Sequence, residues 1–205
     1  ITTVGNKVLK LHPDLNGQLI SGSRIFREGE AMYQLYMVKY AGVDPVTGKA
    51  LYWDAVPKRD ENGQIVRDKH NNPVIEREFA TTDYTSARNN NRQSTGSLLP
   101  KAYGGFGTSV EFFGFDFSMQ FAFQFGGKVY DNSYAALMHG GGTQDMGQNW
   151  HKDILKAWTP ENPYSDVPRL SSEDEFTNSM STRFLVSSNY LTLQNLTLGY
   201  TLPKK

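Results

Sequence analysis

A glycine-rich motif is the part of this sequence that most resembles catalytic machinery. His139–Gly142 reads HGGG, which in lipases contributes backbone amides to an oxyanion hole. That chemistry also requires a serine nucleophile in a G-x-S-x-G turn, and the sequence contains no such turn. We therefore interpret the motif as a flexible loop. No catalytic residues are predicted, and the protein is not expected to be an enzyme.

Metal-ligating side chains are scattered along the sequence. The histidines are His12, His70, His139 and His151. Their intervals are not those of a zinc site, and no acidic or thiolate cluster lies near them. Asp60, Asn62 and Gly63 resemble the start of a calcium loop, but the later ligands and the closing glutamate are missing. We favour a hydrophilic turn there, with a calcium ion in an outer loop as the alternative. No other metal or cofactor is expected.

Four aromatic residues are the better candidates for binding, because aromatic rings stack on sugars and anchor protein interfaces. They are Tyr130, Tyr134, Trp150 and Trp158. Their alternative role is structural, with the two tryptophans packing a short helix against its surroundings. We predict that these four residues contact a substrate or a partner protein.

Charge and composition exclude several classes of protein. Lysine plus arginine and aspartate plus glutamate both number 21, so there is no basic field to attract nucleic acid. Cysteine is absent, which leaves no disulfide framework and no thiolate metal site. The sequence also lacks an apolar run of roughly 18 residues, which excludes a membrane-spanning helix.

Two adjacent segments, residues 102–112 and 115–125, alternate between apolar and polar side chains. Every odd position from Phe115 to Phe125 is apolar, with polar or small residues between them. A helix would spread these side chains around its axis, so the period of two predicts strands. A turn at Phe113 and Gly114 would pair Phe112 with Phe115 and place both apolar rows on one face of a hairpin.

The composition of the two faces favours a membrane barrel over a soluble sandwich. The apolar row is almost entirely phenylalanine, whereas a sandwich core favours valine, isoleucine and leucine. The opposite face carries serine, glutamine and glycine. Strands of about 10 residues, apolar outside and polar inside, are typical of transmembrane barrels. The residues expected to face lipid are Phe106, Val110, Phe112, Phe115, Phe117, Met119, Phe121, Phe123, Phe125, Leu196 and Leu198.

The last strand, residues 187–203, changes phase in its middle. Leu191 and Leu193 occupy odd positions, whereas Leu196 and Leu198 occupy even ones. A β-bulge at Gln194 and Asn195 would return both leucine pairs to one face. We therefore predict a bulge at this point.

The remaining segments divide between strands and loops. Residues 1–11 look like the end of a barrel strand, and residues 102–126 form a transmembrane hairpin. Residues 12–101 and 127–186 are long and hydrophilic, which places them on the extracellular side of an outer-membrane barrel. The first contains a small hairpin from Tyr36 to Trp53, with turn residues between its strands. The second contains a short amphipathic helix at Gly147–Trp158.

Several motifs together resemble a known family. In order they are AGVDPVTGKALYW, YGGFGTSVEFFGFDFSMQFAFQFGGKVYD, NWHKDILKAWTPENP, DVPRL and SNYLTLQNLTLGYTLP. They resemble the C-terminal part of SusC/RagA-type TonB-linked outer-membrane transporters of Bacteroidetes, and they cover most of residues 36–203. The resemblance implies a segment of a large antiparallel transmembrane β-barrel, all-β, with long extracellular loops and one short loop helix.

The resemblance also implies a function and partners. Such transporters import an oligosaccharide or a peptide across the bacterial outer membrane, with a SusD-type surface lipoprotein as a lid and energy from the TonB complex. The plug and the TonB-contacting segment are not found in these residues, so we expect this sequence alone not to transport. The alternative is a soluble or surface-attached β-sandwich that binds carbohydrate through its loop aromatics.

Overall fold

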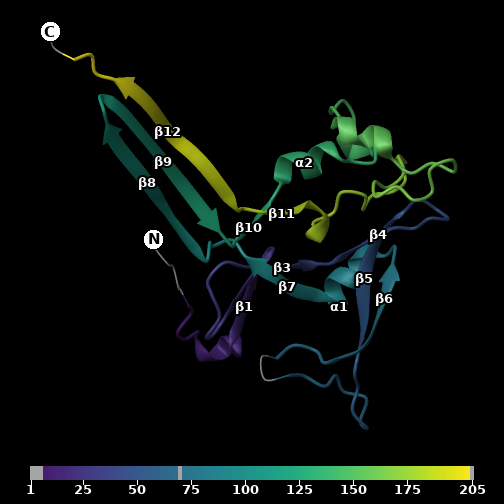
Figure 1. Cartoon of the computed structure of the whole chain (residues 1–205). Coiled ribbons are helices and arrows are strands. Elements are labelled where there is room, and N and C mark those ends of the chain that lie inside the picture. Colours follow the sequence, from purple (N-terminus) through teal and green to yellow (C-terminus); the bar gives the residue numbers. More distant parts are fainter. Residues whose placement is uncertain (1–6, 69–70, 204–205) are drawn as a thin grey trace.

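The computed structural model describes residues 7–68 and 71–203, whose strands form four antiparallel sheets (Figure 1). The first sheet contains β1 (Gln18–Ser21), β2 (Arg24–Arg27), β3 (Gln34–Val38) and β7 (Arg92–Ser97), and the second contains β4 (Tyr40–Val43), β5 (Ala50–Pro57) and β6 (Ile75–Thr81). The third contains β12 (Tyr190–Tyr200), β9 (Phe115–Phe125) and β8 (Ala102–Phe112), and the fourth contains β10 (Lys128–Tyr130) and β11 (Leu185–Ser187).

All the helices are short. The α-helices are α1 (Tyr84–Asn90) and α2 (Asn132–Leu137), and single 3₁₀ turns occur at Pro13–Leu15, Thr143–Asp145, Lys152–Lys156 and Thr182–Phe184. Both α-helices begin after an aspartate whose carboxylate accepts a hydrogen bond from a first-turn amide, which stabilises the helix start. Among the described residues, no helix is both long enough and apolar enough to span a bilayer.

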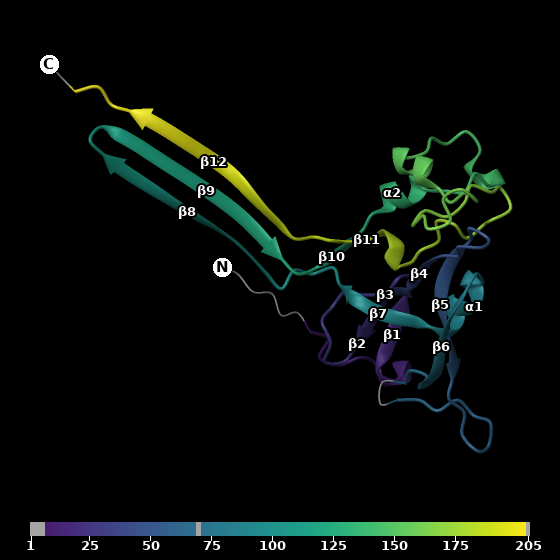
Figure 2. The same cartoon turned by 45° about the vertical axis from the view of Figure 1, so that its right-hand side comes forward.

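The sheet of β8, β9 and β12 projects away from the rest of the molecule in both views (Figures 1 and 2). Each of its strands is 11 residues long. The remaining sheets and helices lie at one end of this projection. The sheet is open, as expected for part of a barrel wall.

The predicted register of the central hairpin is confirmed. Phe112 pairs with Phe115, Phe106 with Phe121, and the pairing continues unbroken to the far end of both strands. The turn uses Phe113 at φ 48° and Gly114 at φ 82°, both left-handed. Two such residues in succession are characteristic of a tight hairpin turn with the twist of a sheet.

The predicted bulge in the last strand is also confirmed. Leu193 of β12 pairs with Phe121, whereas the next partner along β9, Gln120, pairs with Asn195, so Gln194 is the extra residue. The bulge brings Leu196 opposite Met119. Both leucine pairs consequently lie on the same face as the phenylalanine row.

The small hairpin expected from Tyr36 to Trp53 is present but begins later. Its strands are β4 and β5, which pair Tyr40 with Tyr52, and Tyr36 belongs to β3 in the other sheet. The turn has the predicted chemistry, because the Asp44 carboxylate accepts hydrogen bonds from Thr47 and from the Val46 amide.

The helix expected over residues 147–158 is wrong in type and extent. Only Lys152–Lys156 coils, and it does so as a 3₁₀ helix. Ala157 is extended at ψ 149°, and the Trp158 amide bonds instead to the carbonyl of Val167. The indole then packs on Gly48, so contacts with a distant segment override the local helical spacing.

The two long excursions pack together into a single body. We call residues 12–68, 71–101 and 127–186 the loop unit. The indole of Trp158 donates a hydrogen bond to the carbonyl of Pro45 at 3.1 Å, and the Tyr84 hydroxyl donates to that of Met180 at 2.8 Å. The amide of Tyr40 donates to the Thr182 hydroxyl at 3.0 Å. These bonds join segments about a hundred residues apart in the sequence.

The loop unit contains two small buried clusters. One is built from Ala135, Met138, Ile154, Val167 and Phe184, and the other from Val38, Ala50, Tyr52 and Ala87. Arg183 bridges them, because its guanidinium lies over the rings of both Tyr40 and Phe184. Of the barrel strand expected over residues 1–11, residues 1–6 lie outside the described residues. Lys7 and Val8 form bridges to the loop unit.

Candidate functional site

The apolar face of the three-stranded sheet is uncovered. Phe106 is 54% exposed, Leu196 59% and Leu198 74%. Phe106 stacks on Phe121 of the neighbouring strand at 5.0 Å between ring centroids, so the rings contact each other within one layer. Within the described part of the chain no second sheet lies over them, which overturns the alternative of a β-sandwich core. The residues predicted to face lipid all belong to this row, because strand pairing places them on one face.

The opposite face of the same sheet is polar and shallow. A hollow of ≈ 280 Å³ lies over Gly107, Ser109, Ser118, Gln120 and Asn195. At Gly107 a Cβ would lie 2.9 Å from the carbonyl oxygen of Met119, so glycine keeps this surface flat. Hydroxyl and amide groups that are free to bind water suit a surface lining an aqueous space.

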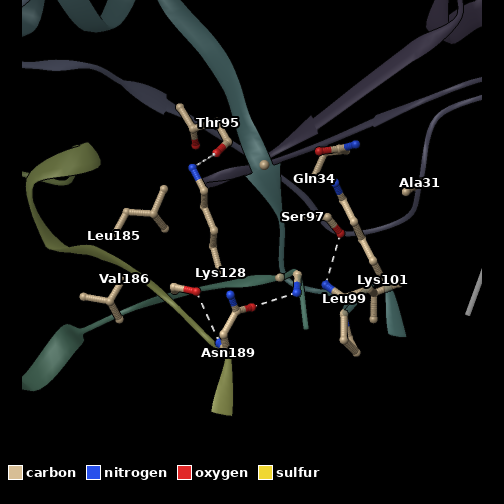
Figure 3. A pocket seen from close by; sticks show the side chains of 15 residues that line it. Ala31, Gln34, Thr95, Ser97, Leu99, Lys101, Lys128, Leu185, Val186 and Asn189 are labelled. Atoms are coloured by element: carbon tan, nitrogen blue, oxygen red, sulfur yellow. Dashed lines mark hydrogen bonds between the residues drawn. The ribbon is translucent and has the colours of Figure 1, made fainter. Parts of the chain in front are cut away.

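A larger pocket lies where this sheet meets the loop unit. Its volume is ≈ 520 Å³, and its walls include Gln34, Ser97, Lys101, Lys128 and Asn189 (Figure 3). Figure 3 shows the Lys128 side chain extending along the pocket to the Thr95 carbonyl, to which its ammonium donates a hydrogen bond of 2.6 Å. The lining residues include two lysines and no carboxylate. The junction pocket therefore combines cationic and amide groups with apolar side chains such as Leu99, Leu185 and Val186.

Hydrogen bonds hold the walls of the junction pocket in place. The Gly126 amide donates to the Asn189 carboxamide at 2.7 Å, and the Ser188 hydroxyl donates to the Gly126 carbonyl at 3.1 Å. Gly126 and Gly127 both adopt positive φ, at 74° and 83°. This left-handed pair turns the chain from β9 into β10.

The four predicted contact aromatics lie in different surroundings. Tyr130 and Tyr134 pack edge-on against Phe184 in a buried cluster. Trp158 packs on the β4–β5 turn, whereas Trp150 is 49% exposed. The structure therefore does not gather them into one platform. Their contact with a ligand stays a prediction, for which Trp150 is the most accessible.

The HGGG motif forms a loop that is packed around its own histidine. His139 is fully buried and stacks on Trp150 at 5.0 Å, and its Nδ1 accepts a hydrogen bond from the Gly141 amide at 3.2 Å. The indole of Trp150 donates back to the His139 carbonyl at 3.1 Å. These contacts fold the loop around the histidine, so it is not the flexible loop expected from the sequence.

The segment that resembles a calcium loop is a turn closed by its own aspartate. One carboxylate oxygen of Asp60 accepts hydrogen bonds from the amides of Asn62 and Gln64, each at 2.9 Å. Over residues 7–68 and 71–203, no group of three or more acidic or histidine side chains is placed to hold a metal ion. His70 lies outside the described residues.

Burial shapes the electrostatics of the loop unit. Desolvation raises the pKa of Tyr40 to about 12, with Arg183 opposing the shift. Burial also raises the pKa of Tyr130 to about 12. A hydrogen bond from the Lys156 ammonium lowers the pKa of the Asp153 carboxyl. The tyrosines are therefore neutral packing groups at ordinary pH.

Sequence reasoning missed the junction pocket and both α-helices. Lys101, Lys128 and Asn189 are far apart in the sequence, and only the pairing of strands brings them together. The helices left a weaker but usable signal, since Asp83 and Asp131 each precede a short run free of proline and glycine.

Comparison with known proteins identifies the architecture. No family model matches the chain. The TonB-dependent receptor P3 of Formosa agariphila is 28% identical over 97% of the chain, which spans 19% of that receptor. Receptor P26 of the same organism is 28% identical over 53% of the chain and 10% of its own length. The RagAB peptide transporter is 27% identical, and the match covers 90% of this chain and 18% of the transporter chain, with a TM-score of 0.65.

The chain is similar to SusC/RagA-type TonB-dependent receptors, and the matches support a C-terminal segment of such a receptor. The RagAB peptide importer in its open-open state supports this, at 27% identity and a TM-score of 0.65 over 96% of the chain. The family resemblance and the all-β barrel-segment fold predicted from the sequence are thus confirmed. Because the chain spans about a fifth of these relatives, the receptor's overall activity goes beyond what this segment shows.

Proposed function

We propose that this receptor segment is part of an outer-membrane nutrient importer without catalytic activity of its own. In this proposal β8, β9 and β12 form part of the barrel wall, and the loop unit lies on the extracellular side. One observation carries the proposal: the three strands have one continuous uncovered apolar face and one polar face. A sheet with these two faces is stable where hydrocarbon meets the first and water meets the second.

The apolar face would lie in the hydrocarbon of the outer membrane. Strands of 11 residues match the length needed to cross a bilayer at a tilt. In water, leaving this row exposed would cost about 25 cal/mol for each Å² of apolar surface. Lipid removes that cost without any covering layer of protein.

The loop unit would meet the nutrient and the partner protein. The nutrient is an oligosaccharide or a peptide, and the partner is a SusD-type lipoprotein above the barrel. Support comes from the similarity to RagAB, which is a peptide importer. The junction pocket lies at the base of the loop unit, where a solute would enter the barrel. Coupling to the TonB complex would occur through other parts of the receptor.

A paired substitution tests the membrane-facing assignment. Phe121→Asp puts a charge on the apolar face, and Gln120→Asp puts the same charge one residue away on the polar face. We expect Phe121→Asp to block assembly, because a charge facing the lipid costs on the order of 2 kcal/mol near the midplane. Gln120→Asp should assemble normally. Heat-modifiable mobility of outer-membrane fractions measures assembly, and equal assembly of both variants would refute the proposal.

A further inference from the structure

A second pocket of the loop unit is lined by arginine and amide side chains. Its volume is ≈ 410 Å³, and it lies between the sheet of β1, β2, β3 and β7 and the segment leading into β6. Three arginines, Arg27, Arg67 and Arg92, line it together with Tyr36. No carboxylate is among the lining residues. We call it the arginine pocket.

Arg27 is built into the wall of the arginine pocket. It is only 7% exposed, which is rare for a charged residue. Its Nε donates a hydrogen bond to the Gln18 carboxamide at 3.3 Å, and its Nη2 donates to that of Asn72 at 2.6 Å. The Glu30 carboxylate lies 3.8 Å from Nη1. The guanidinium is thus fixed in place, and a single, long ion pair partly compensates its charge.

Arg92 places a second guanidinium near the ring of Tyr36, which Arg27 also approaches. Its Cζ lies 4.9 Å from the ring centroid of Tyr36, and the Cζ of Arg27 lies 5.7 Å from the same centroid. Its Nη1 donates to the Gly22 carbonyl at 3.2 Å. Over the described residues, no carboxylate lies within the 4.0 Å of an ion pair from Arg92 or Arg67. The pocket therefore holds two positively charged guanidinium groups against the ring of Tyr36.

The nearby carboxylates bind amide groups. Glu78 accepts hydrogen bonds from the side-chain amides of Gln93 at 2.7 Å and Asn91 at 3.2 Å. Asp68 accepts from the side-chain amide of Asn72 at 3.0 Å. The acids thus orient the amide wall, and within residues 7–68 and 71–203 the Arg92 guanidinium has no ion-pair partner.

We propose that the arginine pocket binds the anionic group of an acidic oligosaccharide, a carboxylate or a sulfate. Guanidinium groups match the geometry of such oxyanions. Several amides of the wall are engaged by Glu78, Asp68 and Arg27. The remaining ones, such as the Gln18 amino group and the Asn89 carboxamide, offer partners for the hydroxyl groups of a sugar. This amide-rich wall favours an oligosaccharide over an acidic peptide. The inference rests on the proposed importer function and narrows its substrate class.

Binding to the full-length receptor, purified in detergent from outer membranes, tests the inference. Calorimetry with trigalacturonate, which carries only carboxylates, and with a κ-carrageenan tetrasaccharide, which carries only sulfates, separates the two anion sources. Maltotriose is the neutral probe, and tetraglutamate is the peptide probe. We expect at least one acidic saccharide to bind, and its affinity to fall as salt is raised.

Arg92→Gln is the decisive variant, because it removes the charge and leaves a neutral, polar amide side chain. We expect it to weaken acidic-saccharide binding at least about tenfold, as for the loss of a charge-assisted hydrogen bond. Arg88→Gln, on the exposed surface of α1, should bind like the unmodified receptor. Binding of neither acidic saccharide, equal binding by Arg92→Gln, or tighter binding of tetraglutamate would overturn the proposal. Because only receptor already assembled in the membrane is tested, such results leave the importer function intact.

Discussion

The three-stranded sheet and the loop unit of this chain are stable for different reasons. The sheet consists of long strands paired in simple register, with its apolar side chains on the outside. The loop unit consists of short elements joined by hydrogen bonds between distant segments, with small buried clusters inside. The sheet leaves its apolar face uncovered, whereas the loop unit encloses its apolar clusters.

Phenylalanine side chains have opposite environments in the two regions. Phe184 of the loop unit is 1% exposed and makes contacts with Tyr130 and Tyr134. Phe115 of the sheet is about half exposed and touches Tyr200 of the next strand. The first is stabilised by protein neighbours and the second, in the proposed barrel, would be stabilised by lipid, so substitutions should separate the two regions.

The largest effect is expected from deleting Gln194, the extra residue of the bulge. The deletion would make β12 pair without a bulge, and would turn Leu191 and Leu193 to the polar face. We expect nearly complete loss of receptor assembled in the outer membrane, measured by heat-modifiable mobility. Gln194→Ala keeps the residue count and should assemble normally. Normal assembly of the deletion variant would show that assembly does not require all four leucines of this strand to lie on one face.

A smaller effect, confined to the loop unit, is expected from Phe184→Ala. Truncating this buried ring should lower the free energy of unfolding of the loop unit by about 3–5 kcal/mol. Urea-dependent proteolysis of the assembled receptor would measure it, because the barrel wall stays resistant while the loop unit is cleaved. Phe115→Ala is the matched variant in the sheet and should leave loop-unit cleavage unchanged. Equal cleavage of the Phe184→Ala and unmodified receptors would contradict the contrast between the regions.

The smallest effect is expected at alkaline pH and concerns Tyr40. Its buried hydroxyl has no hydrogen-bond partner within the described residues, so Tyr40→Phe should be nearly neutral at pH 7. Burial raises the pKa of Tyr40 to about 12. Stability of the loop unit should therefore hold below about pH 10 and fall between about pH 10 and 12, since the unfolded chain releases this proton first.

Tyr40→Phe should remove part of that alkaline loss, on the order of 1 kcal/mol near pH 11. The urea midpoint of loop-unit proteolysis at neutral and alkaline pH measures the change. Tyr164→Phe, at a 90% exposed position, is the control and should follow the unmodified receptor. If the loss of stability at alkaline pH is identical in all three proteins, groups other than Tyr40 cause it.

Much of the sheet was predictable because its signals are local or nearly so. Alternation alone indicates two strands, and the shift between Leu193 and Leu196 indicates the bulge. The prediction of a helix around Trp150 and Trp158 was wrong because the structure there depends on contacts distant in the sequence. A spacing of four residues is compatible with a helix, but Trp158 gains more by packing on the β4–β5 turn from another part of the chain.

The candidate sites were harder to predict than the fold. Lys101 and Lys128 come together only through the pairing of β8 with β9 and of β10 with β11. Arg27 and Arg92 both approach Tyr36 only because β3 lies between β2 and β7. In each case nothing in the local residue pattern distinguishes these cations from ordinary surface lysines and arginines.

By itself the sequence determined the strands of the wall, their register, the bulge and the family, because side-chain alternation and turn residues act over a few neighbouring positions. Only the tertiary structure decided that the two excursions form one body, that the candidate aromatics lie in different surroundings, and that arginines gather around Tyr36. These features depend on contacts between segments far apart in the chain, whose free energy is absent from any short stretch of residues.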